Sequence, residues 1–181
     1  MMRYVSTRGG VEPLTFKAAI MAGLARDGGL FMPESVPSAA ASLERWRTLA
    51  YADLAFEVMR LFADDICADD LRAVIGKSYG VFRHPEVTPV VEVGPVHVLE
   101  LFHGPTLAFK DVALQFLGNL FERILDETGG SMNIVAATSG DTGSAAIYGV
   151  RGRGRMRIFV MHPRGRVSPV QELQMTTVTD A

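Results

Sequence analysis

The sequence predicts an α/β protein in which a mostly helical N-terminal region precedes a parallel βαβ arrangement. Two observations lead to this fold class. Apolar residues recur at helical spacing up to about residue 85. Two apolar runs, residues 132–138 and 156–161, then enclose a short helical stretch, which is the sequence form of a βαβ unit with parallel strands. With 181 residues, 48% of them apolar and 21% charged, the chain can bury a core, and wholesale disorder is excluded.

The N-terminal region begins with short elements in the order strand, helix, extended segment and connection. They are expected over residues 4–7, 15–22, 30–32 and 34–42. Gly23 ends the helix, because glycine readily adopts the backbone conformation that follows a helix C-terminus. The Ser/Ala/Pro-rich composition of the last segment indicates a connection between elements.

Two longer helices are expected to complete this region. The first covers about residues 51–63. The second carries Asp69 and Asp70 in its first turn, where the helix dipole favours acidic side chains, and Lys77 near its end. The pattern changes soon afterwards, so we place a domain boundary between residues 1–88 and residues 89–181.

Strands and helices alternate after the boundary. The expected order is two strands, a long helix, a strand, a short helix, a strand and a last helix, over residues 90–93, 96–102, 111–128, 132–138, 144–149, 156–161 and 168 onward. The continuous apolar run at 132–138 indicates a strand buried on both faces. Ser168, Pro169 and Gln171 form a capping box for the last helix.

Charge and cysteine content exclude several classes of function. The 18 basic and 20 acidic residues are spread along the chain, without the basic footprint of a nucleic-acid-binding protein. Cys67 is the only cysteine, and the four histidines show no metal spacing, so we expect neither a disulfide framework nor a metal site. No apolar run is long enough to span a membrane, and the N-terminus lacks a signal-peptide core, so we expect a cytoplasmic protein.

A loop of small polar residues, Thr138 to Gly143, lies between the first apolar strand and the following helix. Ligands of open α/β sheets bind at the carboxyl ends of strands, and a helix N-terminus attracts anions. The loop has neither the Gly-Lys-Ser/Thr ending of a Walker A loop nor a complete GxGxxG pattern. It predicts an anion-binding loop, with an ordinary β-to-α turn as the alternative.

Lys110 is the second candidate, and it is one of only three lysines beside 15 arginines. It lies where the chain enters the long helix, a position that the positive end of the helix dipole makes unfavourable for a cation. The same surroundings, with Phe109 beside it, favour a neutral amine that can act as a Schiff-base nucleophile. The alternative is a solvated surface lysine, with Asp111 capping the helix.

Several segments together are far more specific than either candidate alone. They are Glu100-Leu-Phe-His-Gly-Pro-Thr-Leu-Ala-Phe-Lys-Asp, Ala137-Thr-Ser-Gly-Asp-Thr-Gly-Ser, Tyr4-Val-Ser-Thr-Arg-Gly and Gly23-Leu-Ala-Arg-Asp-Gly-Gly-Leu-Phe-Met-Pro-Glu. In this order, and over essentially the whole chain, they resemble threonine synthases, which belong to the fold-type II pyridoxal-phosphate enzymes. The Thr-Ser-Gly-Asp-Thr-Gly loop by itself indicates only that wider group.

The resemblance implies a lyase that converts O-phosphohomoserine and water into threonine and phosphate, the last step of threonine biosynthesis, with pyridoxal 5′-phosphate as cofactor. It implies that Lys110 forms the Schiff base and acts as the catalytic acid and base. Ser139, Gly140 and Thr142 would bind the substrate carboxylate. Asp141 would lie near the ring hydroxyl of the cofactor, although many relatives outside the threonine synthases have Asn there.

The chain departs from the family in length, because threonine synthases are much longer. Their later glycine-rich loop around the cofactor phosphate, and their residues at the pyridine nitrogen, are not found before Ala181. We therefore expect residues 89–181 to be the first part of a truncated catalytic fold, and the chain alone to be an inactive fragment. The alternatives are another fold-type II lyase, or a non-catalytic relative that binds a phosphorylated ligand. The sequence leaves the oligomeric state open.

Overall fold

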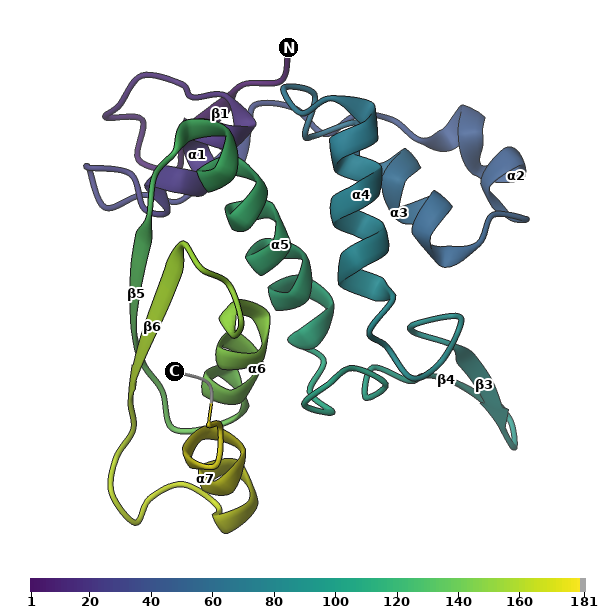
Figure 1. Ribbon diagram of the computed structural model, residues 1–181. Helices are drawn as coiled ribbons and strands as arrows, with labels where there is room; N and C mark the ends of the chain where they lie inside the picture. Colours follow the sequence, from purple (N-terminus) through teal and green to yellow (C-terminus); the bar gives the residue numbers. More distant parts are fainter. Residues whose placement is uncertain (180–181) are drawn as a thin grey trace. The chain divides into compact units, whose positions relative to one another are not determined.

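The computed structural model describes residues 1–179 as a mixed α/β structure of short sheets and helices (Figure 1). The chain divides into two units, residues 1–75 and 76–181, with the division inside the helix α4. The boundary that we placed at residue 88 stays a prediction. No described helix is long and apolar enough to cross a bilayer.

The first unit contains a small antiparallel sheet and a series of short helices. Its elements are β1 (Tyr4–Ser6), α1 (Phe16–Ala22), β2 (Phe31–Pro33), the 3-10 helix η1 (Ala40–Ser42), α2 (Leu43–Trp46), α3 (Tyr51–Met59) and the start of α4 (Ala68–Tyr79). The strand and the extended segment expected here are both present, and β1 pairs with β2 in an antiparallel sheet, a pairing that the sequence had not indicated. The expected connection over residues 34–42 ends in η1, and α2 follows it directly and buries Trp46 in the core.

Tyr4 ties the start of the chain to the helical part of this unit. Its buried hydroxyl donates a hydrogen bond to the carbonyl oxygen of Phe62, at 3.0 Å. Burial, and then the negative charges of Asp64 and Asp65, raise the pKa of the Tyr4 hydroxyl to about 12. The neutral phenol is therefore the form that the folded unit favours.

This pKa predicts a loss of stability in alkali. The unfolded chain releases the Tyr4 proton near its ordinary pKa of about 10, whereas the folded unit holds that proton up to a pKa of about 12. The free energy of unfolding should fall as the pH rises from about 10 to about 12. Denaturant unfolding of wild type and Tyr4→Phe across this range checks the prediction. Their difference should shrink as the pH rises, and a constant difference would contradict it.

The second unit contains a hairpin and then a parallel βαβ arrangement. Its elements are the end of α4, β3 (Val90–Val93), β4 (Val96–Leu99), α5 (Asp111–Thr128), β5 (Met132–Ala137), α6 (Asp141–Val150), β6 (Met156–Met161) and α7 (Pro169–Thr176). β3 and β4 are antiparallel, and β5 and β6 are parallel, from the Met132–Met156 pair to the Ala137–Met161 pair. The βαβ prediction is therefore confirmed.

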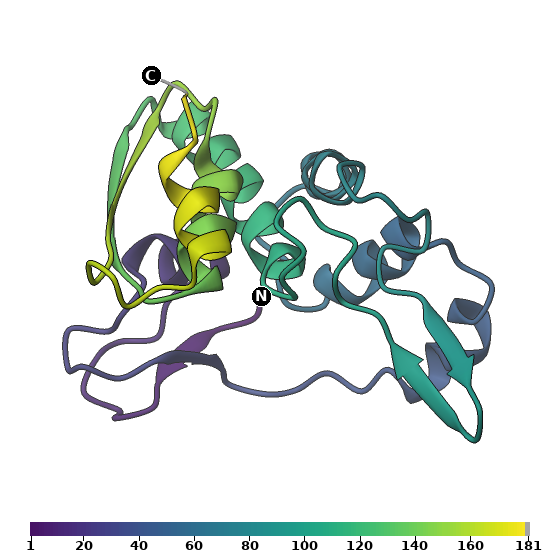
Figure 2. The ribbon, with the colours of Figure 1, turned by 90° about the horizontal axis from the view of Figure 1, so that it is seen from below.

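Helices α6 and α7 lie on one side of the β5–β6 sheet, and α5 packs against α6 (Figures 1 and 2). The other side carries exposed apolar side chains from both strands, Val135, Phe159 and Met161. Our expectation that residues 132–138 are buried on both faces is therefore wrong in the described structure. The alternation of β5 side chains between exposed and half-buried follows from helices covering only one face.

Helices α5 and α6 approach so closely that only glycine fits at their crossing. A Cβ atom added to Gly118 would lie 1.8 Å from the carbonyl oxygen of Gly149, and one added to Gly149 would lie 2.6 Å from that of Leu114. Leu120 and Ala145 are completely buried. The N-terminal ends of the two helices, which carry the candidate residues, are thereby held in a fixed relation.

Candidate active site

Lys110 occupies the N-cap position of α5, and its amine faces the start of α6. The Lys110 Nζ donates a hydrogen bond to Asp141 Oδ1 at 2.6 Å, so the two candidate residues form an ion pair. Both side chains are about one-third exposed, at 29% and 38%. The sequence argument considered only apolar surroundings and the helix dipole for this amine, and the structure adds a carboxylate partner.

The amine also borders an apolar pocket of about 470 Å³. The pocket is lined by Leu101, Phe109, Lys110, Val112, Ala113, Leu114 and Thr142. The Lys110 Nζ lies 5.2 Å from the centre of the Phe109 ring. Thus Lys110 and Thr142, which are 32 positions apart in the sequence, line one opening. Its walls are aliphatic and aromatic, which is typical of a site for a flat organic group.

The loop between β5 and α6 offers backbone donors at the same place. Gly140 is the N-cap of α6 and brings no side chain to cap the helix, so that the first N–H groups are available to an anion. The Thr138 hydroxyl accepts a hydrogen bond from the Gly140 N–H at 3.3 Å, which shapes the loop from inside. Ser139 and Thr142 are exposed, whereas Gly140 and Asp141 are half-buried.

The glycine of this loop that lacks room for a side chain is Gly143. A Cβ atom there would lie 2.4 Å from the Met175 sulfur and 2.6 Å from the Thr138 methyl carbon. At Gly140 the nearest atom, from Gln171, would lie at an ordinary 3.5 Å. The loop therefore needs glycine at 143 for packing. The described structure leaves space at 140, toward which a ligand could approach the backbone.

The alternative to a catalytic Lys110 was a solvated lysine beside an Asp111 that caps α5. In the structure Asp111 does not cap this helix. It is completely buried, and its carboxylate turns back to the preceding loop. Oδ2 accepts a hydrogen bond from the Thr106 N–H at 2.7 Å, and Oδ1 accepts one from the Thr106 hydroxyl at 2.8 Å. Burial raises the pKa of the Asp111 carboxyl, while the donors of Thr106 and the N–H groups of Ala108 and Leu107 oppose that rise.

Sequence analysis missed this buried carboxylate and the loop that it holds. Leu107 has φ of 64°, a conformation that a residue with a branched side chain rarely adopts. Strained residues of this kind gather at functional sites. The five-residue spacing between Thr106 and Asp111 matches no local capping motif, so the sequence offered no direct signal. Among the described residues, no cluster of His, Cys, Asp or Glu could hold a metal ion.

His103 is a loop residue that makes a local hydrogen bond. Its Nε2 lies 2.7 Å from Glu100 Oε2, and both side chains are largely buried. The ring packs against Phe102 in a tilted arrangement, with centroids 4.6 Å apart. These contacts shape the segment that leads from β4 towards Lys110.

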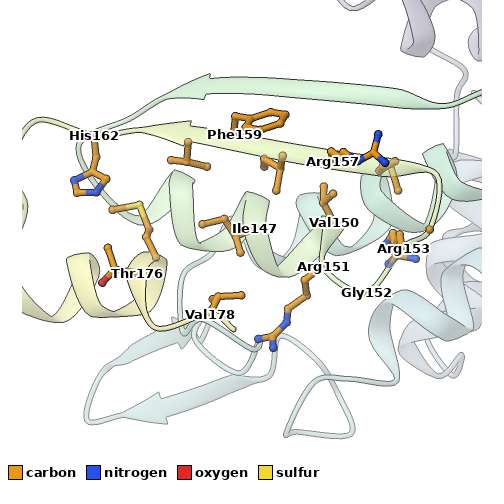
Figure 3. A pocket seen from close by; sticks show the side chains of 15 residues that line it. Ile147, Val150, Arg151, Gly152, Arg153, Arg157, Phe159, His162, Thr176 and Val178 are labelled. Carbon is orange, nitrogen blue, oxygen red and sulfur yellow. The ribbon is translucent and has the colours of Figure 1, made fainter. Parts of the chain in front are cut away.

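A larger hollow of about 760 Å³ lies along β6, away from the candidate residues. Figure 3 shows Ile147 and Val150 of α6 on one side of it, with Thr176 at the end of α7 and Val178 just beyond that helix. Arg151 and Arg157 also border it but point apart, so they do not converge on one ligand group. The described lining contains none of the predicted site residues.

Comparison with known proteins agrees with this geometry. The family model described as "Threonine synthase N terminus" matches residues 3–79. The threonine synthases of Schizosaccharomyces pombe and Pseudomonas aeruginosa are each 51% identical to the chain over 98% of its length. The crystal structure of PLP-bound threonine synthase from Brucella melitensis superposes with a TM-score of 0.91, at 47% identity over 97% of the chain.

This chain belongs to the threonine synthase family. It matches the N-terminal portion of its relatives and spans 37% of the S. pombe protein, 38% of the P. aeruginosa protein and 38% of the B. melitensis chain. The expected fold class, a helical N-terminal region followed by the start of a fold-type II domain, is confirmed by the structural match. The roles expected of Lys110, Ser139, Gly140, Asp141 and Thr142 stay predictions.

Proposed function

We propose that the protein acts as a threonine synthase, which converts O-phosphohomoserine and water into threonine and phosphate with pyridoxal 5′-phosphate. The observation that carries this proposal is the meeting of three groups from distant segments: the Lys110 amine, the Asp141 carboxylate and the open N-terminus of α6. The sequences around them are those through which the chain resembles the family. The threonine synthases to which the chain is similar support the reaction, and the PLP-bound structure from Brucella melitensis supports the cofactor.

The described residues fit this cofactor. A single amine borders an apolar opening of about 470 Å³, and an adjacent carboxylate can accept a hydrogen bond from a ring hydroxyl. Lys110 would hold the cofactor covalently, and Asp141 would lie near its ring. When bound, pyridoxal phosphate supplies the electron sink for a carbanion at the substrate Cα.

The chain's own residues then bind the substrate and move protons. The α6 N–H groups and the hydroxyls of Ser139 and Thr142 would hold the substrate carboxylate, with Gly140 leaving space for its approach. The Lys110 Nζ would take the proton from Cα and then one from Cβ, so that phosphate leaves from Cγ. The Lys110 Nζ would return these two protons, one to Cγ after phosphate has left and one to Cα after water has added at Cβ, which gives threonine. The ion pair with Asp141 sets the position of the Lys110 amine before cofactor and substrate bind.

A chimera tests the proposed reaction. Residues 1–181 would replace the matching N-terminal segment of the Pseudomonas aeruginosa threonine synthase, to which they are 51% identical. We expect the chimera to form threonine and phosphate from O-phosphohomoserine. Deamination of serine or threonine without that reaction would favour another fold-type II lyase. Binding of phosphorylated ligands without turnover would favour a non-catalytic relative. The cytoplasmic location expected from the sequence belongs to the same proposal.

Thr142 is expected to affect substrate binding more than cofactor binding. Thr142→Val keeps the shape of the side chain but removes the hydroxyl, and losing a hydrogen bond to a charged group costs roughly 1.5–3 kcal/mol. We expect the KM for O-phosphohomoserine in the chimera to rise by about tenfold or more, with an unchanged cofactor absorption spectrum. Thr142→Ser, which keeps the hydroxyl, is the control. A KM within about twofold of wild type in Thr142→Val would count against this role.

A further inference from the structure

A buried carboxylate is the feature of this site that the proposed chemistry leaves unused. Asp111 follows Lys110 directly and is completely buried, although ionised carboxylates are rarely found without solvent. Both of its oxygens are hydrogen-bonded to Thr106, which is itself buried. An acid in the first turn of α5 would be favoured by the helix dipole even at the surface, so the dipole alone does not account for its burial.

The loop from Gly104 to Ala108 is built around this carboxylate. A Cβ atom at Gly104 would lie 2.5 Å from both Asp111 Cβ and Asp111 Oδ2, so the backbone at Gly104 passes directly over the carboxylate. Leu107 holds its strained φ of 64° between Thr106 and the start of α5. The carbonyl oxygen of Thr106 accepts a further hydrogen bond from Gln174 Nε2 of α7, at 3.1 Å.

The end of this loop sets the position of Lys110. The Asp111 N–H donates a hydrogen bond to the Ala108 carbonyl oxygen at 3.0 Å. This bond closes a tight turn, and Lys110 lies within that turn. From this turn the Lys110 Nζ reaches Asp141 Oδ1 at 2.6 Å. A strained turn persists only where its surroundings over-determine it, and here the paired oxygens of Asp111 supply that restraint.

We propose that Asp111 is a positioning residue for Lys110: through Thr106 it holds the strained 104–108 turn, and this turn keeps the Lys110 amine against Asp141. This inference rests on the proposed function, which gives the Lys110 amine its role. The placement of the amine itself is independent of cofactor and substrate. Asp111 therefore acts through Lys110 and touches neither ligand.

Competitive acetylation of the cofactor-free chain tests this proposal. Acetic anhydride at limiting concentration modifies amines according to their accessibility and nucleophilicity, and peptide mass spectrometry reports each lysine separately. Lys77, on α4, is an internal standard. Like Lys110 it forms an ion pair, in this case with Glu122 at 2.6 Å. In Asp111→Asn an amide NH2 group replaces one carboxylate oxygen. This NH2 group faces a donor of Thr106, so one of the two hydrogen bonds to Thr106 is lost. We expect the acetylation rate of Lys110 relative to Lys77 to rise roughly tenfold.

A milder pair of variants keeps the test decisive where Asp111→Asn unfolds. Thr106→Val removes the hydroxyl donor but keeps the N–H donor, and Thr106→Ser keeps both. Thr106→Val should raise the Lys110 to Lys77 ratio severalfold, and Thr106→Ser should leave it at the wild-type value. Circular dichroism confirms that each variant is folded at the labelling temperature.

Two results would overturn the proposal. One is a Lys110 to Lys77 ratio within about twofold of wild type in folded Asp111→Asn or Thr106→Val. The other is an equal rise at both lysines, which would make Asp111 a support of general stability only. Acetylation needs no cofactor and no substrate. A failed turnover assay would therefore refute the proposed function without changing the outcome here.

Discussion

Lys110→Ala is expected to abolish threonine formation while leaving the fold intact. The amine is the proposed covalent holder of the cofactor and the proposed acid and base, so both functions are lost together. General acid–base catalysis alone contributes about 10²- to 10⁴-fold, and we expect kcat/KM of the chimera to fall by at least about 1,000-fold. The side chain is 29% exposed and is held by its ion pair with Asp141, so thermal unfolding should change little.

Lys77→Ala is the matched control for this prediction. Lys77 is also ion-paired and lies near the end of α4, with 63% of its side chain exposed. Its loss should leave kcat/KM within about twofold of wild type, as is usual for an exposed salt bridge. A Lys110→Ala chimera that keeps more than a tenth of wild-type activity would contradict the role of Lys110.

Gly118→Ala should have the largest effect on stability. The new methyl group would lie 1.8 Å from the Gly149 carbonyl oxygen, which is backbone and cannot rotate away. Helices α5 and α6 must therefore separate, and overpacking of this kind costs typically 1–3 kcal/mol and occasionally more. We expect the free energy of unfolding to fall by about 3 kcal/mol, measured by denaturant unfolding with circular dichroism.

Gly76→Ala is the control for this substitution. Gly76 lies within α4, and a Cβ atom there would meet nothing within 4 Å. Alanine in a helix interior is roughly 0.5–1 kcal/mol better than glycine, so this variant should be slightly more stable than wild type. Equal changes in the two variants would show that the α5–α6 crossing is less tight than described.

Local patterns were sufficient to predict most elements of the fold. Thr15 and Gly23 bound α1, and Ser168 accepts the Gln171 N–H at the start of α7, as their residue types indicated. Gly129 ends α5 in the left-handed conformation. These features depend on backbone groups a few residues away, which the sequence displays directly. The four-residue helix α2 was missed because its formation depends on burial of Trp46 rather than on a local pattern.

The site was predicted in its parts but not in its connections. Lys110 and Asp141 were each singled out, yet their ion pair depends on how α5 and α6 cross, which is set by Gly118 and Gly149. The burial of Asp111 depends in the same way on packing of a loop that local spacing does not reveal. Similarly, exposure of one face of β5 follows from where the helices lie, whereas an apolar run alone indicates only that a strand can be buried.

The most direct test of this account is reductive trapping of the cofactor on the chimera. Borohydride would be added after loading with pyridoxal 5′-phosphate, and the peptides would then be mapped by mass spectrometry. The chain offers only Lys17, Lys77 and Lys110 as lysine sites, so the position of the label is unambiguous within it. We predict a phosphopyridoxyl group on Lys110. A stoichiometric label on Lys17 or Lys77, with Lys110 unmodified, would contradict the assignment of Lys110 as the cofactor-binding amine.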